Sequence, residues 1–159
     1  MSRSRKHHRD RNQAQHISMF NITEKQEMHR EAIARGTVKI SRETMELIRQ
    51  NKIPKGDVLT SAKIAGIMAA KKTAELIPLW YPQSITHVDV RLNFLLETSE
   101  IEIISVVHTK AATGVEMEAL TAVAIAGLTI YDMLKQVDSE MILENIRLIK
   151  KTGGKSAEF

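Results

Sequence analysis

Residues 113–138 predict one long apolar helix whose ionisable groups lie only near its two ends. Glu116 and Glu118 stand at its start, Asp132 and Lys135 stand near its end, and no charged residue lies between Glu118 and Asp132. Small residues keep this helix thin, so that neighbouring backbones can approach it closely: Ala119, Ala122, Ala124, Ala126 and Gly127. Such a helix is a rigid support for a fixed acid/base site. The alternative interpretation is a core helix with solvated charged ends.

The 159-residue chain is long enough for one domain with a sizeable core, and 43% of its residues are apolar. It contains no cysteine, which excludes disulfides, thiolate zinc sites, protein-ligated iron–sulfur clusters and a cysteine nucleophile. We expect Asp132 and Lys135 to keep the long helix shorter than the roughly 18 apolar residues that span a bilayer. The basic, polar start shows no apolar signal segment. These features predict a cytoplasmic protein without a membrane partner.

The net charge of +4 comes from the first 16 residues alone. This segment holds five basic residues and one acidic residue, which leaves 18 of each sign in the rest of the chain. We therefore predict a basic, disordered tail over residues 1–18 and a single catalytic domain over residues 19–159. An RNA-binding or partner-binding role for the tail ranks below a dispensable extension. The tail histidines lack any fixed geometry for a metal.

The first half of the chain predicts one short strand and two helices. Residues 36–40 are typical of a strand, and Ser41 is suited to cap a helix that runs to about Gln50. Pro54 and Gly56 mark a loop. A second helix follows, capped by Thr60 or Ser61, and ends before Pro78.

The second half predicts an antiparallel hairpin, the long helix and a final strand. Apolar residues alternate over 85–97, residues 98–100 form a turn, a second strand starts at Ile101, and residues 141–149 form the last strand. Apart from the extra N-terminal helix, the order is β-α-β-β-α-β, an α+β, ferredoxin-like arrangement with an antiparallel sheet. Apolar residues on the second side of the hairpin predict a covering partner subunit, and hence an oligomer: Leu95, Ile104 and Val106.

Several motifs identify a family resemblance. They are TGVEMEALTA from Thr113, TIYDM from Thr129, KGDVL from Lys55, AKIAGIMAAKKTAELIPL from Ala62 and GGKS from Gly153. With them, the chain from Met19 onward closely resembles the cyclic pyranopterin monophosphate synthases, the MoaC proteins of molybdenum cofactor biosynthesis. The resemblance implies a ferredoxin-like fold, hexamers built from dimers, and a lyase. This lyase converts 3',8-cyclo-7,8-dihydro-GTP into cyclic pyranopterin monophosphate and pyrophosphate.

Asp132 and Lys135 lie three residues apart on a helix and therefore share a face. The resemblance adds Lys55 to them and makes the three residues the catalytic centre. Lys55 lies in a Lys-Gly-Asp turn, where Gly56 lets the backbone approach a ligand. We expect two neighbouring amines to lower each other's pKa, which suits a general acid/base pair. The alternative interpretation is a surface ion pair and a turn lysine in water.

The segment Glu116, Met117 and Glu118 is a candidate for base recognition. If it is extended, both glutamates point to one side and suit the N–H donors of a guanine-like edge. The alternative is that the glutamates only favour the helix N-terminus through its dipole. The resemblance places the segment in the pterin pocket.

Residues 151–156, KTGGKS, are not an ATP-binding phosphate loop, because Ile149 stands where that motif requires glycine. Lys151, Lys155 and the glycine N–H groups still suit a looser anion site. The resemblance adds Lys25 and Arg30 to the triphosphate contacts; without it, both are surface charges on a polar helix or loop. We expect no required cofactor and no dedicated metal site, although magnesium can accompany the triphosphate.

The chain departs from the family at Leu79-Trp80-Tyr81-Pro82, where the family usually has Leu-Cys-His-Pro with its histidine in the active site. Tyr81 has an ordinary pKa of about 10 and is a poor proton shuttle at neutral pH. Trp80 adds volume, Asn21 replaces the common aspartate, and His87 is a candidate to compensate. The second functional hypothesis is therefore a catalytically weakened paralogue that binds a nucleotide or a partner without turnover.

Overall fold

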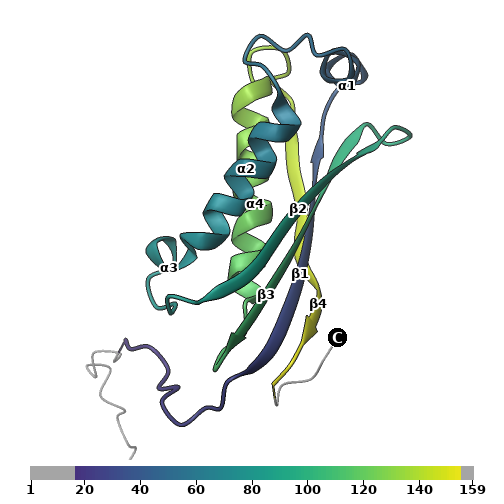
Figure 1. Cartoon of the computed structure of the whole chain (residues 1–159). Helices are drawn as coiled ribbons and strands as arrows, with labels where there is room; N and C mark the ends of the chain where they lie inside the picture. Colours follow the sequence, from purple (N-terminus) through teal and green to yellow (C-terminus); the bar gives the residue numbers. More distant parts are fainter. Residues whose placement is uncertain (1–16, 155–159) are drawn as a thin grey trace, which may run out of the picture.

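The computed structural model describes residues 17–154. Eight elements follow one another along the chain: β1 Met28–Lys39, α1 Arg42–Arg49, α2 Val58–Lys71, α3 Thr73–Leu76, β2 Ile85–Leu95, β3 Glu100–Ala111, α4 Glu116–Leu134 and β4 Ile142–Thr152 (Figure 1). The predictions about the tail at residues 1–16 and about Lys155 lie outside the described residues.

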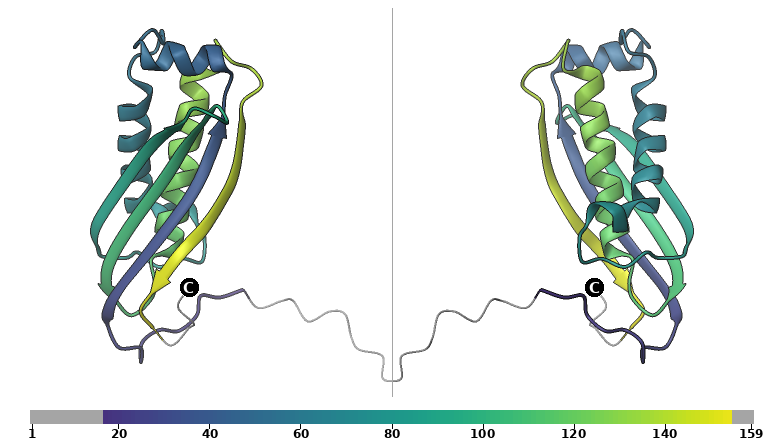
Figure 2. Two further views of the ribbon diagram at one scale, coloured as in Figure 1. Left: turned by 90° about the vertical axis from the view of Figure 1, so that its right-hand side faces the viewer. Right: turned by 90° about the vertical axis from the view of Figure 1, so that its left-hand side faces the viewer.

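The four strands form one antiparallel sheet in the order β2-β3-β1-β4. Helices α2 and α4 lie on one face of it, and α1 lies beyond the end of the sheet at which α4 finishes (Figures 1 and 2). The predicted α+β class, the antiparallel sheet and the β2–β3 hairpin are therefore confirmed.

Helices α1 and α2 begin at side-chain caps. Ser41 caps α1 as predicted, because its Oγ accepts a hydrogen bond from the Thr44 N–H at 3.0 Å. The prediction for α2 was wrong by a few residues. Asp57 is its cap, and the Asp57 carboxylate accepts from both the N–H and the hydroxyl of Thr60.

Strand β1 is longer than the predicted residues 36–40, and it includes Arg30, for which the alternative interpretation was a surface charge on a helix or loop. Over residues 28–34 the only buried side chains are those of the small Ala32 and Ala34, so this part of the strand shows no run of large apolar residues. Strand β4 similarly continues to Thr152, past the predicted end at 149.

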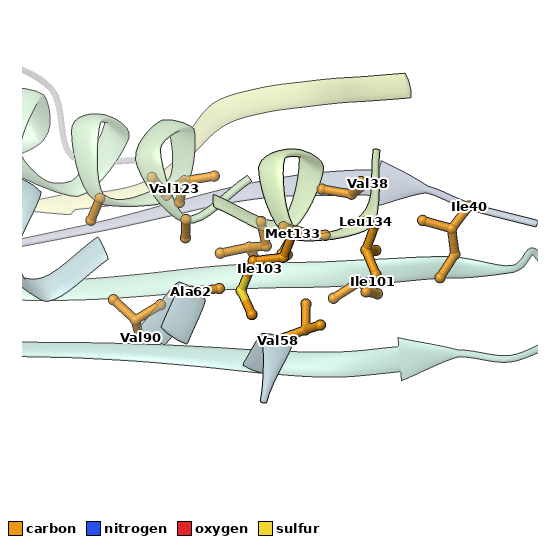
Figure 3. Packing of buried hydrophobic residues seen from close by; sticks show 14 of the residues in the cluster. Val38, Ile40, Val58, Ala62, Val90, Ile101, Ile103, Val123, Met133 and Leu134 are labelled. Carbon is orange, nitrogen blue, oxygen red and sulfur yellow. The ribbon is translucent and has the colours of Figure 1, made fainter. Parts of the chain in front are cut away.

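The core lies between the sheet and the α2–α4 layer. Buried side chains of β1, β2, β3, α2 and α4 meet there, as Figure 3 shows for Val38, Val58, Ala62, Val90, Ile101, Ile103, Val123, Met133 and Leu134. The two helices cross closely at Gly66, where an added Cβ would lie 2.9 Å from the Ala122 carbonyl oxygen. The predicted close approach of a neighbouring backbone to the thin helix is confirmed at this contact.

Helix α4 is long and apolar enough, by length and composition alone, to cross a membrane. It has 19 residues, although we had expected Asp132 and Lys135 to keep it shorter than a membrane span. Half of its most apolar stretch is buried inside the protein, and the helix packs against α2 and three strands. These contacts are those of a core helix.

The open face of the sheet is more polar than the hairpin pattern predicted. Ile104 and Val106 are half-buried there, and ion pairs flank them, namely Arg35 to Glu102 at 2.6 Å and Arg91 to Asp89 at 2.6 Å. This face is therefore a small apolar centre inside a charged rim.

Candidate active site

Lys55, Asp132 and Lys135 meet at the C-terminal end of α4. The Asp132 carboxylate lies between the two amines, with Oδ2 2.8 Å from Lys55 Nζ and Oδ1 2.7 Å from Lys135 Nζ. Lys55 Nζ also donates to the Asp132 carbonyl oxygen at 2.9 Å. A cation at this position satisfies a backbone acceptor that the helix end leaves free. The structure thus brings the three predicted catalytic residues together.

The carboxylate controls the protonation of this cluster. Hydrogen bonds from Lys135 and then Lys55 lower the pKa of Asp132 to about 2. The same contact raises the pKa of Lys135. Our expectation of a lowered pKa was therefore wrong for Lys135, because Asp132 stands between the amines and outweighs their mutual repulsion.

The turn before α2 places Lys55. Gly56 has a φ of 100°, a left-handed conformation that favours glycine, and nothing lies within 4 Å of the position of an added Cβ. Gly56 therefore serves the turn, and the space beside it is open within this chain. The predicted approach of its backbone to a ligand stays a prediction. Asp57 then starts α2 and fixes the orientation of the loop that carries Lys55.

A pocket of about 540 Å³ lies at the opposite end of the sheet, beside the start of α4. Its lining includes four of the residues predicted to bind substrate: Lys25, Arg30, Glu116 and Lys151. Sequence reasoning missed Gln26, Met28 and Thr113 of the same lining, for which the only signal was their closeness in sequence to Lys25, Arg30 and Glu116.

Some charged side chains that line this pocket already have partners within the chain. Lys151 Nζ pairs with the Glu116 carboxylate at 2.8 Å. The Arg30 guanidinium donates to three backbone carbonyls, those of Ala111, Ala112 and Gly153. Gly153 has a φ of 86°, and an added Cβ would lie 2.5 Å from the His29 carbonyl oxygen, so only glycine fits. Arg30 therefore holds the pocket wall together.

Glu116, Met117 and Glu118 form the first turn of α4 and are not extended, so the condition under which both glutamates would point to one side is not met. Residues two apart point in different directions on a helix. Glu116 lines the pocket, Met117 is half-buried, and Glu118 is buried at 2% exposure. Glu118 Oε1 accepts a hydrogen bond from Trp80 Nε1 at 2.7 Å, and burial is the main cause that raises the pKa of Glu118.

Trp80 and Tyr81 connect this buried acid to the N-terminal segment. Their rings meet edge to face at a centroid distance of 5.9 Å, and the Tyr81 hydroxyl donates to the Phe20 carbonyl oxygen. Asn21 Oδ1 accepts from the Thr23 N–H. His87 lies on the open face of the sheet beside His108, opposite the helical layer, so it does not take the place of the family histidine.

One chain does not bring the two groups of residues together. Glu116 and Asp132 are separated by most of α4, which amounts to about 24 Å along the helix axis at the usual rise per residue. The lysine–aspartate cluster and the pocket therefore lie at opposite ends of α4, the helix that runs along the sheet in Figure 1.

Comparison with known proteins places these features in a family. The family model described as MoaC family matches residues 19–154. The chain belongs to the MoaC family. Its match includes both ends of α4, and hence the lysine–aspartate cluster and the described lining of the pocket.

Relatives of this MoaC protein carry the name cyclic pyranopterin monophosphate synthase. That of Thermomicrobium roseum is 52% identical over 141 residues, which are 89% of this chain and 85% of the relative. That of Desulforamulus reducens is 53% identical over 141 residues, with the same two shares. That of Peptoclostridium acidaminophilum is 47% identical over 148 residues, which are 93% of each chain.

Proposed function

We propose that this protein is a cyclic pyranopterin monophosphate synthase of molybdenum cofactor biosynthesis. It converts 3',8-cyclo-7,8-dihydro-GTP into cyclic pyranopterin monophosphate and releases pyrophosphate. The carrying observation is the Asp132 carboxylate between Lys55 and Lys135 in a chain that is about half identical to relatives of that name. Those relatives support turnover, and nothing supports the weakened paralogue.

Lys55 and Lys135 act as the acid/base pair in this proposal, and Asp132 holds them and stabilises their charge. Because the carboxylate raises the pKa of Lys135, this residue starts the reaction protonated and serves as the general acid. The two amines and one carboxylate keep a net positive charge when both amines are protonated. This charge favours negative charge that develops on the substrate as pyrophosphate leaves.

The pocket at the other end of α4 holds the substrate. Lys25, Lys151 and Lys155 bind the triphosphate, and Arg30 supports them by fixing the backbone around Gly153. Lys151 must exchange its Glu116 partner for phosphate, which releases Glu116 to accept from the base. Met117, Glu118, Trp80 and Tyr81 complete the base side of the site. Magnesium, where present, enters with the triphosphate, and no other cofactor is needed.

The separation of the two groups leads us to propose a site shared by two chains. The lysine–aspartate cluster of one chain acts on substrate in the pocket of another, because a nucleotide does not bridge the roughly 24 Å between them within one chain. We accordingly propose a hexamer, a trimer of dimers, in the cytoplasm. The strand order β2-β3-β1-β4 supports assignment of each subunit to the ferredoxin-like fold.

The test is direct turnover. Purified protein is incubated with 3',8-cyclo-7,8-dihydro-GTP, and the pterin product and pyrophosphate are measured together. Equal amounts of both products are expected. Tight binding of the substrate without either product would instead identify a weakened paralogue, and absence of binding would reject both functions.

A further inference from the structure

Trp80 and Glu118 make a contact that neither the lysine–aspartate cluster nor the phosphate contacts explain. Trp80 follows α3 in the connection to β2, and Glu118 lies 38 residues later in the first turn of α4. The indole Nε1–H donates to Glu118 Oε1 at 2.7 Å. Glu118 is 2% exposed, so the acceptor end of this bond is buried, and Trp80 is half-buried.

The second oxygen of this carboxyl group is unsatisfied. Glu118 Oε2 is buried and has no hydrogen-bond partner among residues 17–154. A buried polar atom without a partner is costly, and such atoms commonly meet a ligand, an ion or water. Because Trp80 already donates to Oε1, Oε2 is the carboxylate oxygen that lacks a donor and is the better acceptor for one that arrives.

We propose that Trp80 is a positioning residue for Glu118: its indole N–H fixes Oε1 and leaves Oε2 to accept an N–H of the substrate's base. The inference rests on the proposed function, in which Glu118 contacts the guanine-derived ring. It adds that Trp80 determines which atom of Glu118 meets the ring, and it predicts that Trp80 sets the preference for a guanine edge over an adenine edge.

The indole suits this task for a chemical reason. Its N–H is a donor only, so it meets an acceptor in one fixed direction. A cysteine, which the family usually has here, is smaller and carries a weak S–H donor. The edge-to-face contact with Tyr81 further restricts the indole ring. The positioning contact is therefore a property of this chain's Trp80-Tyr81 pair.

The same contact keeps Glu118 ionised over a wider pH range. Burial raises the pKa of Glu118, the Trp80 hydrogen bond lowers it, and the charge of Glu116 raises it. Glu116 is the charged group that acts on Glu118, and its own partner is Lys151 on β4. Trp80 is the neutral donor from the α3–β2 connection. Removal of the indole donor must raise the pKa of Glu118 further, whereas a purely structural role for Trp80 predicts no such change.

The experiment removes one N–H group and keeps the shape of the side chain. Because the chain has a single tryptophan, growth of a tryptophan auxotroph on benzothienylalanine, in which sulfur replaces the indole N–H, changes position 80 alone. The probes are GTP and ATP, which share the triphosphate and differ in the edge of the base. Calorimetry measures both affinities between pH 5 and 8 for the parent, the benzothienylalanine protein and Trp80→Phe.

We expect the isosteric change to weaken GTP binding about tenfold, the usual scale of one hydrogen bond, and ATP binding less than about twofold. The acidic limb of GTP binding should move up by about one pH unit. Glu118→Gln keeps an acceptor for the indole and should lose this acidic limb. In the Glu118→Gln protein, the isosteric change at position 80 should therefore cause no further shift in the pH dependence of GTP binding. The isostere decides the result if Trp80→Phe fails to fold.

Equal losses for GTP and ATP would make Trp80 a structural residue only and would overturn the inference. An unchanged acidic limb, or a parent that does not prefer GTP to ATP, would overturn it as well. Failure of the proposed function is a separate result, since it means that the parent forms no pterin product while the GTP preference and its dependence on Trp80 persist.

Discussion

The two ends of α4 carry acidic side chains whose pKa values move in opposite directions. Asp132, near the C-terminus, is exposed between two ammonium groups, and its pKa falls to about 2. Glu118, in the first turn, is buried beside a neutral donor, and its pKa rises. One helix thus supports an acid that stays ionised and an acid that resists ionisation.

The helix dipole predicts the reverse of this difference. Its positive N-terminal end should favour the charged form of Glu118, and its negative C-terminal end should disfavour that of Asp132. Burial and direct partners therefore outweigh the dipole at both ends of α4. The comparison teaches that burial and the nearest hydrogen-bond donors determine the chemistry of each end.

Loss of a catalytic amine should have the largest effect. We predict that Lys135→Ala and Lys55→Ala each lower turnover by about 10²–10⁴, the usual scale for a general acid or base. Asp132→Asn should also impair turnover, because the amide keeps the shape and loses the charge that holds both amines. The measurement is single-turnover product formation, with substrate affinity and thermal stability as controls. Near-normal rates in all three variants would move the chemistry away from this end of α4.

Combining two variants, each defective at a different end of α4, in one oligomer should give the next largest effect. Lys135→Ala lacks the catalytic end, and Lys151→Ala lacks a phosphate contact at the pocket end. When both variants are co-expressed, a site shared by two chains should recover up to about a quarter of the parent activity, because half of the random dimers contain one intact site of two. Either variant alone should stay inactive. No recovery in proven mixed oligomers would show that each chain uses its own two ends.

The contact in the middle of α4 offers a change that should disturb stability and leave both ends unaltered. Gly66→Ala places a Cβ 2.9 Å from the Ala122 carbonyl oxygen, where backbone must shift. We predict a loss of about 1–3 kcal/mol in the free energy of unfolding, as for other overpacked sites. Urea unfolding measures it. Ala65→Ser, at the residue of α2 just before Gly66, is the control, because Ala65 is only partly buried. Equal stability of both variants would contradict a tight α2–α4 contact.

The sequence predicted the core of this fold well, because its signals are local. Ser41 precedes α1, alternating apolar residues mark β2, and uninterrupted apolar residues mark α4. The start of β1 was missed since the only buried side chains there are those of the small Ala32 and Ala34.

The site depended on pairs distant in sequence, and these were harder to predict. Lys55 and Asp132 were linked only through the family resemblance, since no local pattern connects residues 77 positions apart. Neither the Lys151–Glu116 pair nor the Trp80–Glu118 bond has a local signal. The sequence therefore did not predict that the two glutamate side chains point to different partners. The predicted direction of the pKa shift of Lys135 was wrong for the same reason, because that direction depends on which charged group lies closest to the amine.

The smallest predicted effect compares the pH dependence of stability at the two ends. Asp132 has a folded pKa below its unfolded value, so its contribution is present above the unfolded pKa and is lost as pH falls toward about 2. Glu118 has a raised folded pKa, so the folded state holds its proton longer, and stability falls as pH rises above the ordinary value for glutamate. Asp132→Asn should therefore flatten the curve of unfolding free energy between pH 4 and 2, whereas Glu118→Gln should flatten it above pH 4.5. Urea titrations across both ranges measure the two slopes. If both variants change the slope with the same sign, then the contrast between an ion-paired acid and a buried acid on one helix is wrong.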